Sequence, residues 1–159
     1  EALNAGALTN DYIAEENGEE GMFATLFFGV LNPLTGNMAY VNGGHEPLFI
    51  VNQSGIRDRL NSTGPVVGMM PEMTYAIRQI ELEPGDIVIG YTDGVTEAMS
   101  PDESLFGKKR FQALLEKPSS TASELIERIR QELFKHIANA PQFDDITMLA
   151  VHRESEVVE

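Results

Sequence analysis

Cysteine is absent from these 159 residues, and basic side chains are scarce. The lack of cysteine excludes disulfides, thiolate zinc sites and cysteine nucleophiles, and it is typical of a reducing cytoplasm. Lys and Arg number 11 against 25 Asp and Glu, which gives a formal net charge of −14. Nucleic acids and anionic membrane surfaces are bound through basic patches, so we expect neither as a partner.

Long hydrophobic runs are also missing, since no segment approaches the roughly 18 apolar residues of a membrane span. No secretory leader is visible either. The hydrophobic content of 42% is nevertheless ordinary for a globular protein. We therefore expect one cytoplasmic domain over residues 1–152, followed by a short tail over residues 153–159.

Hydrophobic periodicity and turn signals predict an α+β domain, in which antiparallel strands precede most of the helices. The Asn-Pro-Leu-Thr-Gly-Asn stretch at residues 32–37 marks one hairpin turn, and Gln53-Ser54-Gly55 marks another. Thr121 and Glu124 form a capping box at the start of the last helix. The predicted helices cover residues 1–15, 103–116 and 121–138, and the predicted strands cover residues 22–31 (buried on both faces), 38–42, 47–52, 56–60, 73–82, 86–91 and 145–152.

Two short acidic motifs follow or precede apolar strands about fifty residues apart. Asp93 and Glu97 come directly after the run Ile87-Val88-Ile89, and Asp144 and Asp145 come directly before Met148-Leu149-Ala150-Val151. Carboxylates without Cys or His are the ligands that hard divalent cations prefer. The pattern therefore indicates a Mg²⁺ or Mn²⁺ site.

The spacing alone leaves two interpretations open. In one, the Asp-Gly pair at 93–94 is an ordinary turn and Asp144 a remote strand boundary. In the other, the carboxylates converge, and two of them about 5 Å apart would repel by roughly 3 kcal/mol at an effective dielectric constant of about 20. A converged cluster therefore requires a cation.

The motifs themselves resemble those of a known family. Gly85-Asp86 followed by Tyr91-Thr92-Asp93-Gly94 is similar to a signature of the metal-dependent serine/threonine protein phosphatases (the PPM, type 2C-like family). The resemblance is to the bacterial branch typified by sporulation stage II protein E and RsbU. Segments similar to this branch occur in the family's order at residues 22–30, 40–47, 64–68, 85–98 and 143–147.

This resemblance implies an antiparallel β-sandwich flanked by helices, with two Mn²⁺ or Mg²⁺ ions that activate a hydroxide to hydrolyse phosphoserine or phosphothreonine. It implies that Asp93 and Asp144 are catalytic metal ligands. The Gly94 carbonyl is a companion ligand, and Glu97 corresponds to an acid associated with a weaker third ion. Asp145 is expected to orient its neighbour, and Gly44 and His45 to line the site; for His45 the alternative is a structural turn histidine.

The first metal-binding motif of the family, Asp-x-x-Gly, has no match here. We therefore expect a domain that lacks its N-terminal strands and binds fewer ions than two, or none, with an open sheet edge through which two copies pair. The expected partner is a phosphorylated regulator such as an anti-sigma-factor antagonist. The alternatives are a catalytically inactive regulatory or interaction module and, more remotely, a metal-dependent phosphodiesterase.

Overall fold

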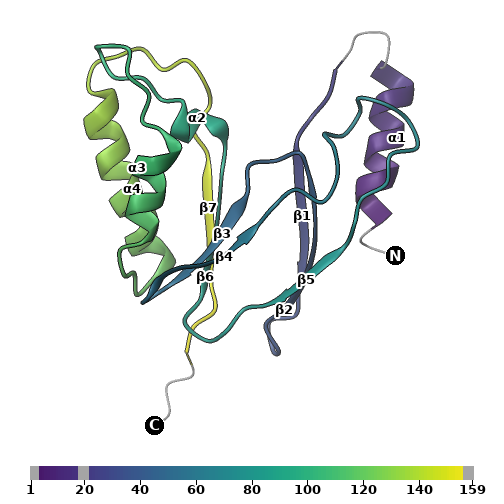
Figure 1. The fold of residues 1–159 in the computed structure, drawn as a ribbon, viewed down its shortest axis with the longest axis horizontal. Coiled ribbons are helices and arrows are strands. Elements are labelled where there is room, and N and C mark those ends of the chain that lie inside the picture. Colours follow the sequence, from purple (N-terminus) through teal and green to yellow (C-terminus); the bar gives the residue numbers. More distant parts are fainter. Residues whose placement is uncertain (1–3, 18–21, 156–159) are drawn as a thin grey trace. The chain divides into compact units, whose positions relative to one another are not determined.

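The computed structural model describes residues 4–17 and 22–155, which form two compact units (Figure 1). The first unit comprises Glu1–Pro47 and Leu60–Glu83, and the second comprises Leu48–Arg59 and Pro84–Glu159. Each contains one antiparallel sheet and at least one helix. The predicted α+β class with antiparallel sheets is confirmed. Within the described residues, no helix has the length and apolar character needed to cross a bilayer.

The first unit contains a three-stranded sheet in the order β1-β2-β5, together with α1 (Ala5–Asn17). The predicted hairpin is present, because β1 (Leu26–Leu31) pairs antiparallel with β2 (Asn37–Gly43). The other side of β2 pairs with β5 (Arg78–Glu81). The buried Asn10 of α1 accepts hydrogen bonds from the Gly68 amide (2.9 Å) and the Tyr75 hydroxyl (3.2 Å), which tie the helix to the loop before β5.

Two predictions in this unit are wrong in detail. The strand expected over residues 22–31 begins only at Leu26, and its residues are half-buried or exposed because β1 is an outer strand. The strand expected over residues 73–82 is limited to Arg78–Glu81, and before it the Ala76 amide donates to the Thr63 carbonyl at 3.0 Å. In α1, the apolar side chains of Leu8 and Tyr12 are exposed, and residues 1–3 of the predicted helix lie outside the described residues.

The second unit contains a four-stranded sheet in the order β4-β3-β6-β7. The second predicted hairpin is present as β3 (Leu48–Asn52) beside β4 (Gly55–Leu60). The inner strand β6 (Ile87–Tyr91) pairs with β3 on one side and with β7 (Met148–His152) on the other. Its side chains are buried at Ile87, Val88, Ile89 and Tyr91. Strand β6 is therefore an inner strand, and backbone hydrogen bonds on both sides fix the position of its end.

Two amphipathic helices, α3 (Lys108–Leu115) and α4 (Ala122–Ile137), lie side by side and cover this sheet (Figure 1). Helix α4 contributes Leu125, Ile129, Leu133 and Ile137 to the core, and Ala122 packs against it. The predicted N-cap is observed, since the Thr121 hydroxyl accepts a hydrogen bond from the Glu124 amide at 3.1 Å. The Glu124 carboxylate in turn accepts from the Ser120 amide, one residue before the cap.

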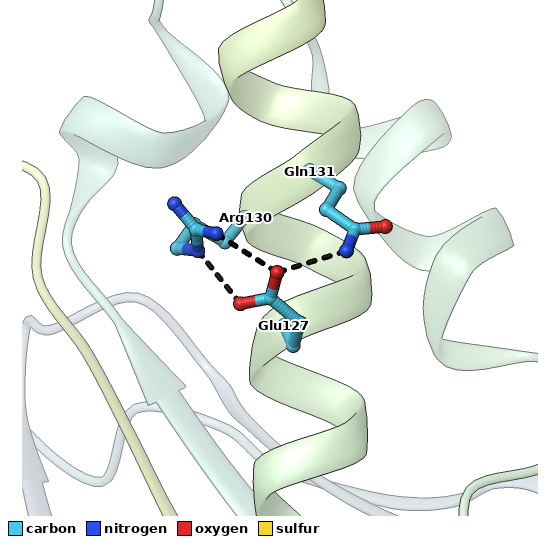
Figure 2. A network of polar contacts seen from close by, with 3 residues as sticks. All are labelled: Glu127, Arg130 and Gln131. Carbon is cyan, nitrogen blue, oxygen red and sulfur yellow. Dashed lines mark hydrogen bonds and ion pairs between the residues drawn. The ribbon is translucent and has the colours of Figure 1, made fainter.

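The solvent side of α4 carries a polar network (Figure 2). The Glu127 carboxylate accepts two hydrogen bonds from Arg130, at 2.7 and 2.8 Å, and a third from Gln131 at 2.8 Å. These bonds, foremost the pair from Arg130, lower the pKa of Glu127 to about 2. The network stabilises the charged form of an exposed side chain.

Helix α3 is shorter than predicted. The sequence suggested a helix over residues 103–116, yet Glu103 and Gly107 have positive φ angles and the helix begins at Lys108. The Ser100 and Ser104 hydroxyls both donate to the Asp102 carboxylate, which also lowers the pKa of Asp102. This side-chain network stabilises a turn in competition with the helix.

Candidate active site

The first acidic motif lies where β6 meets a short helix. Tyr91 ends the strand, and α2 (Asp93–Thr96) begins two residues later. Sequence reasoning missed this helix, which spans a single turn. Asp93 occupies its first position with an exposed side chain, while Val95 is buried in the core. The Oδ1 atom of Asp93 accepts a hydrogen bond from the Gly94 amide at 3.0 Å.

Thr92 connects the first motif to the second. Its hydroxyl donates to the carbonyl oxygen of Asp145 at 2.8 Å and accepts from the Thr147 amide at 3.0 Å. Its own amide donates to the Thr147 carbonyl at 3.0 Å. Three hydrogen bonds therefore hold the residue before Asp93 against the segment that follows Asp144. These bonds also explain why the strand predicted from residue 145 begins only at Met148: the segment before it bonds largely to a side chain.

Gly94 packs directly against the second motif. A Cβ atom built on Gly94 would lie 2.4 Å from the carbonyl oxygen of Asp145 and 3.5 Å from the carbonyl carbon of Asp144. Any residue with a side chain would force the two segments apart, because a backbone atom cannot rotate out of the way. The close approach of the two chains therefore requires glycine at this position.

The acidic side chains of the site are exposed. This holds for Asp93, Glu97, Asp144 and Asp145. The Oδ1 atom of Asp144 accepts from the Asp145 amide at 2.7 Å, and its carbonyl oxygen accepts from Gln142 Nε2 at 2.8 Å. Glu97 and Asp144, together with Gly94, line one cavity of about 440 Å³. The structure thus brings the two acidic motifs to the same place in the second unit.

The acidic side chains of the site are of the chemical type that binds hard divalent cations. They are carboxylate oxygens and they are open to solvent, as Mg²⁺ and Mn²⁺ ligands are. In number they make up only part of a ligand set, because the described residues contain no group of three or more His, Cys, Asp or Glu side chains placed to hold a metal ion. The predicted metal roles of Asp93, Gly94, Glu97 and Asp144 stay predictions.

Gly44 and His45 belong to the first unit. Gly44 has a φ of +68°, and an added Cβ would lie 2.5 Å from Val66. The His45 amide donates to the Asn42 side chain at 2.9 Å, and its ring Nδ1 is 3.1 Å from the Thr25 hydroxyl. These bonds show how the turn is built. The expectation that Gly44 and His45 line the site stays a prediction.

Thr92 is the residue that sequence reasoning overlooked. It lies inside the acidic motif, but the sequence predicted roles only for the carboxylates of that motif and none for the Thr92 hydroxyl. The available signal was a hydroxyl side chain between a buried strand and a helix start, a position where such groups bond to nearby backbone. Its actual partners are more than fifty residues away in the chain, and no local pattern specifies them.

Comparisons with known proteins agree with this architecture. Residues 5–154 match the family model described as Stage II sporulation protein E (SpoIIE). The chain is 54% identical over 151 residues to Protein IcfG of Synechocystis, a match that covers 95% of this chain and 24% of that protein. It is 29% identical to Phosphoserine phosphatase RsbU of Bacillus subtilis, covering 89% of this chain and 42% of that protein.

Among solved structures, the phosphatase domain of the cell fate determinant SpoIIE from Bacillus subtilis, presoaked with Mn, shares the fold. The TM-score is 0.63 at 15% identity, and the match covers 89% of this chain and 60% of that one. The chain spans well under half the length of the two curated relatives named above. The family model covers nearly all of the described residues, and the chain therefore belongs to the SpoIIE family of PP2C-like serine phosphatase domains.

Proposed function

We propose that this chain forms the catalytic domain of a metal-dependent phosphatase that hydrolyses phosphoserine or phosphothreonine on a regulatory protein. The observation that carries the proposal is the set of three hydrogen bonds between Thr92 and residues 145–147, which holds the two acidic motifs together. Family membership supports the reaction class, and the name of the relative RsbU supports phosphoserine as the substrate group.

In this proposal Asp93 and Asp144 hold a Mn²⁺ or Mg²⁺ ion jointly. The Gly94 carbonyl is a further donor, Glu97 serves a more weakly held ion, and Asp145 orients Asp144. A bound divalent cation supplies a Lewis acid for phosphoryl oxygens and lowers the pKa of water. The residues of the chain contribute rigid placement, because Tyr91 and Val95, on either side of Asp93, are buried in the core.

The charge of the site explains why a cation is required. A phosphoester dianion that approaches Asp93, Glu97 and Asp144 meets carboxylates of its own sign, on a chain whose formal net charge is −14. Repulsion of this kind amounts to a few kcal/mol at contact distances. A bound cation would offset this repulsion, and Asp93 and Asp144 are the residues that would hold it.

The reaction is an exchange of one phosphorus–oxygen bond for another. The oxygen of a water molecule forms the new bond to phosphorus, and the bond from phosphorus to the serine or threonine oxygen breaks. That oxygen leaves with a proton, so the products are the free hydroxyl side chain and inorganic phosphate. Exposure of Asp93 and Asp144 allows a folded phosphoprotein to reach the site without local unfolding.

Substrate and assembly are the finer parts of the proposal. The expected substrate is a small phosphorylated regulator, such as an anti-sigma-factor antagonist. Pairing of two copies through a sheet edge is also proposed, since β1 and β7 are outer strands of their sheets.

The test is phosphate release from a phosphoserine protein or peptide by the full-length protein at saturating Mn²⁺. Asp93→Asn should abolish turnover, because an amide keeps the shape of the side chain but loses the charge that holds the cation. Glu97→Gln should lower the rate less. Asp58→Asn is a matched control: Asp58 is exposed on the opposite edge strand, β4, and its Oδ1 likewise accepts from the next amide, at 2.7 Å.

Wild-type turnover by folded Asp93→Asn would refute the proposed metal site. A wild-type protein that releases no phosphate from any phosphoprotein at saturating Mn²⁺ would instead favour the inactive regulatory module. Circular dichroism of each variant separates loss of activity from loss of folding.

A further inference from the structure

The cavity beside Asp144 is lined by several apolar side chains, which neither a phosphate group nor a cation requires. It has a volume of about 440 Å³, within the range of pockets that hold ligands. One side is formed by Gly94, Glu97 and Met99, which follow β6, and another by Ile137 at the end of α4. Leu105 and Phe143 also line it. All of these residues belong to the second unit.

Two of the wall residues are large apolar side chains exposed to solvent. The Phe143 side chain is 71% exposed and Leu105 is 52% exposed. Exposed apolar side chains that gather in one patch mark interaction sites or ligand-binding grooves. Since both side chains line one cavity, they are placed to cover an apolar group that enters it.

Local hydrogen bonds connect the residues of the cavity wall to one another. The Gln142 side chain donates to the Asp144 carbonyl at 2.8 Å, and the Ala140 amide donates to the Ile137 carbonyl at 2.9 Å. On the other side, Met99 and Leu105 form an isolated antiparallel bridge. Little ordering is therefore required when a side chain binds, which favours affinity.

The position and charge of the cavity identify its occupant. Gly94 and Asp144 belong both to the cavity and to the proposed cation-binding edge, and consecutive Cα atoms are about 3.8 Å apart. A phosphoserine at that edge would therefore have its neighbours within reach of the hollow. Glu97 and Asp144 line the same space, so an acidic neighbour would be repelled by their negative charge while an apolar one would be buried.

We propose, on the basis of the function proposed above, that this cavity is the specificity pocket of the phosphatase. It holds an apolar side chain, such as Leu, Ile or Met, that lies within two residues of the phosphorylated residue. Leu105 and Phe143 are the residues that determine this preference.

The test uses the full-length protein, Mn²⁺ and two kinds of substrate. One is a set of phosphoserine peptides in which Leu, Ala or Asp is placed at each of the two positions before and after the phosphoserine. The other is p-nitrophenyl phosphate, which has no neighbouring residue. We expect kcat/KM at one position to follow the order Leu, Ala, Asp, with roughly tenfold between Leu and Ala.

Phe143→Ala and Leu105→Ala should each remove most of this preference by lowering kcat/KM for the Leu peptide. Hydrolysis of p-nitrophenyl phosphate should stay within about twofold of the wild type. Phe134→Ala is the matched control, since Phe134 is 52% exposed on α4 and does not line the cavity. It should retain the full preference for Leu.

Equal kcat/KM for the Leu, Ala and Asp peptides at all four positions would overturn the pocket assignment, while turnover of p-nitrophenyl phosphate would still support the phosphatase. A preference for Leu that survives in both folded variants would also overturn it. A wild-type protein inactive on both kinds of substrate would refute the proposed function, and the pocket proposal would fall with it.

Discussion

Replacing Thr92 with valine removes the hydroxyl that joins the two acidic motifs and leaves the shape of the side chain nearly unchanged. The hydroxyl makes two hydrogen bonds, to the Asp145 carbonyl and from the Thr147 amide. Each is worth about 0.5–1.5 kcal/mol net. Thr92 is half-buried, and Asp145 and Thr147 are exposed, so water can replace part of what is lost. We therefore expect a local loss of about 1–2 kcal/mol.

Amide hydrogen exchange measures this loss where it occurs. The Thr147 amide donates to Thr92, so its exchange should become roughly 5- to 30-fold faster in Thr92→Val, as a change of about 1–2 kcal/mol requires. Thr92→Ser keeps the hydroxyl and is the matched control, with exchange near that of the wild type. Protection of the β6 and α4 amides should be unchanged in both variants.

Activity should respond more strongly than stability. Displacement of a catalytic group by about 1 Å can cost on the order of a hundredfold in rate. In Thr92→Val we therefore expect kcat/KM to fall by about tenfold or more, together with a higher half-saturating concentration of Mn²⁺, while Thr92→Ser retains both values. Unchanged exchange at Thr147 combined with full activity in Thr92→Val would refute the idea that this hydroxyl holds the site together.

Gly94→Ala should cost about 1–3 kcal/mol and most of the activity, because its Cβ would lie 2.4 Å from the Asp145 carbonyl oxygen. Thermal unfolding and phosphate release check this against Gly90→Ala, whose added Cβ would meet the flexible Leu48 side chain at 3.1 Å; equal effects of the two changes would contradict the close-packing argument. Glu127→Gln should lower thermal stability slightly at neutral pH. Because folding lowers the pKa of Glu127 from 4.5 to about 2, its contribution is present above about pH 4.5 and is lost as the pH falls through about 2. Melting temperatures of wild type and Glu127→Gln should therefore converge at low pH, with Glu132→Gln as the matched change on α4, and a constant difference down to pH 2 would exclude this mechanism.

Local features of the fold were predictable because their causes are local. The capping threonine at 121 and the apolar stripe of α4 follow from residues three or four positions apart. The hairpins β1–β2 and β3–β4 follow from turn residues between short apolar runs. The placement of carboxylates at the end of β6 and before β7 is likewise visible in the sequence.

What could not be predicted depends on residues distant in the chain. Strands β5 and β6 are consecutive and separated by a tight Pro84-Gly85 turn, yet they belong to different sheets. The partial exposure of β1 reflects its outer position in a sheet, which the apolar residues of the strand do not encode. The turn over residues 100–107 is stabilised by hydroxyl bonds to Asp102, which override a helical pattern.

The arrangement of the site separates folding from metal binding. The residues that fix its geometry are Tyr91 and Val95 in the core, Gly94 in close contact with the Asp145 backbone, and the hydroxyl of Thr92. None of them carries a charge. The groups that would hold a cation lie exposed to solvent. Because burial of these acids is not part of the fold, we expect the domain to fold without a bound cation. We therefore expect changes at the uncharged Thr92 and Gly94 to lower activity as well, because these residues position the carboxylates that the proposal assigns to the cation.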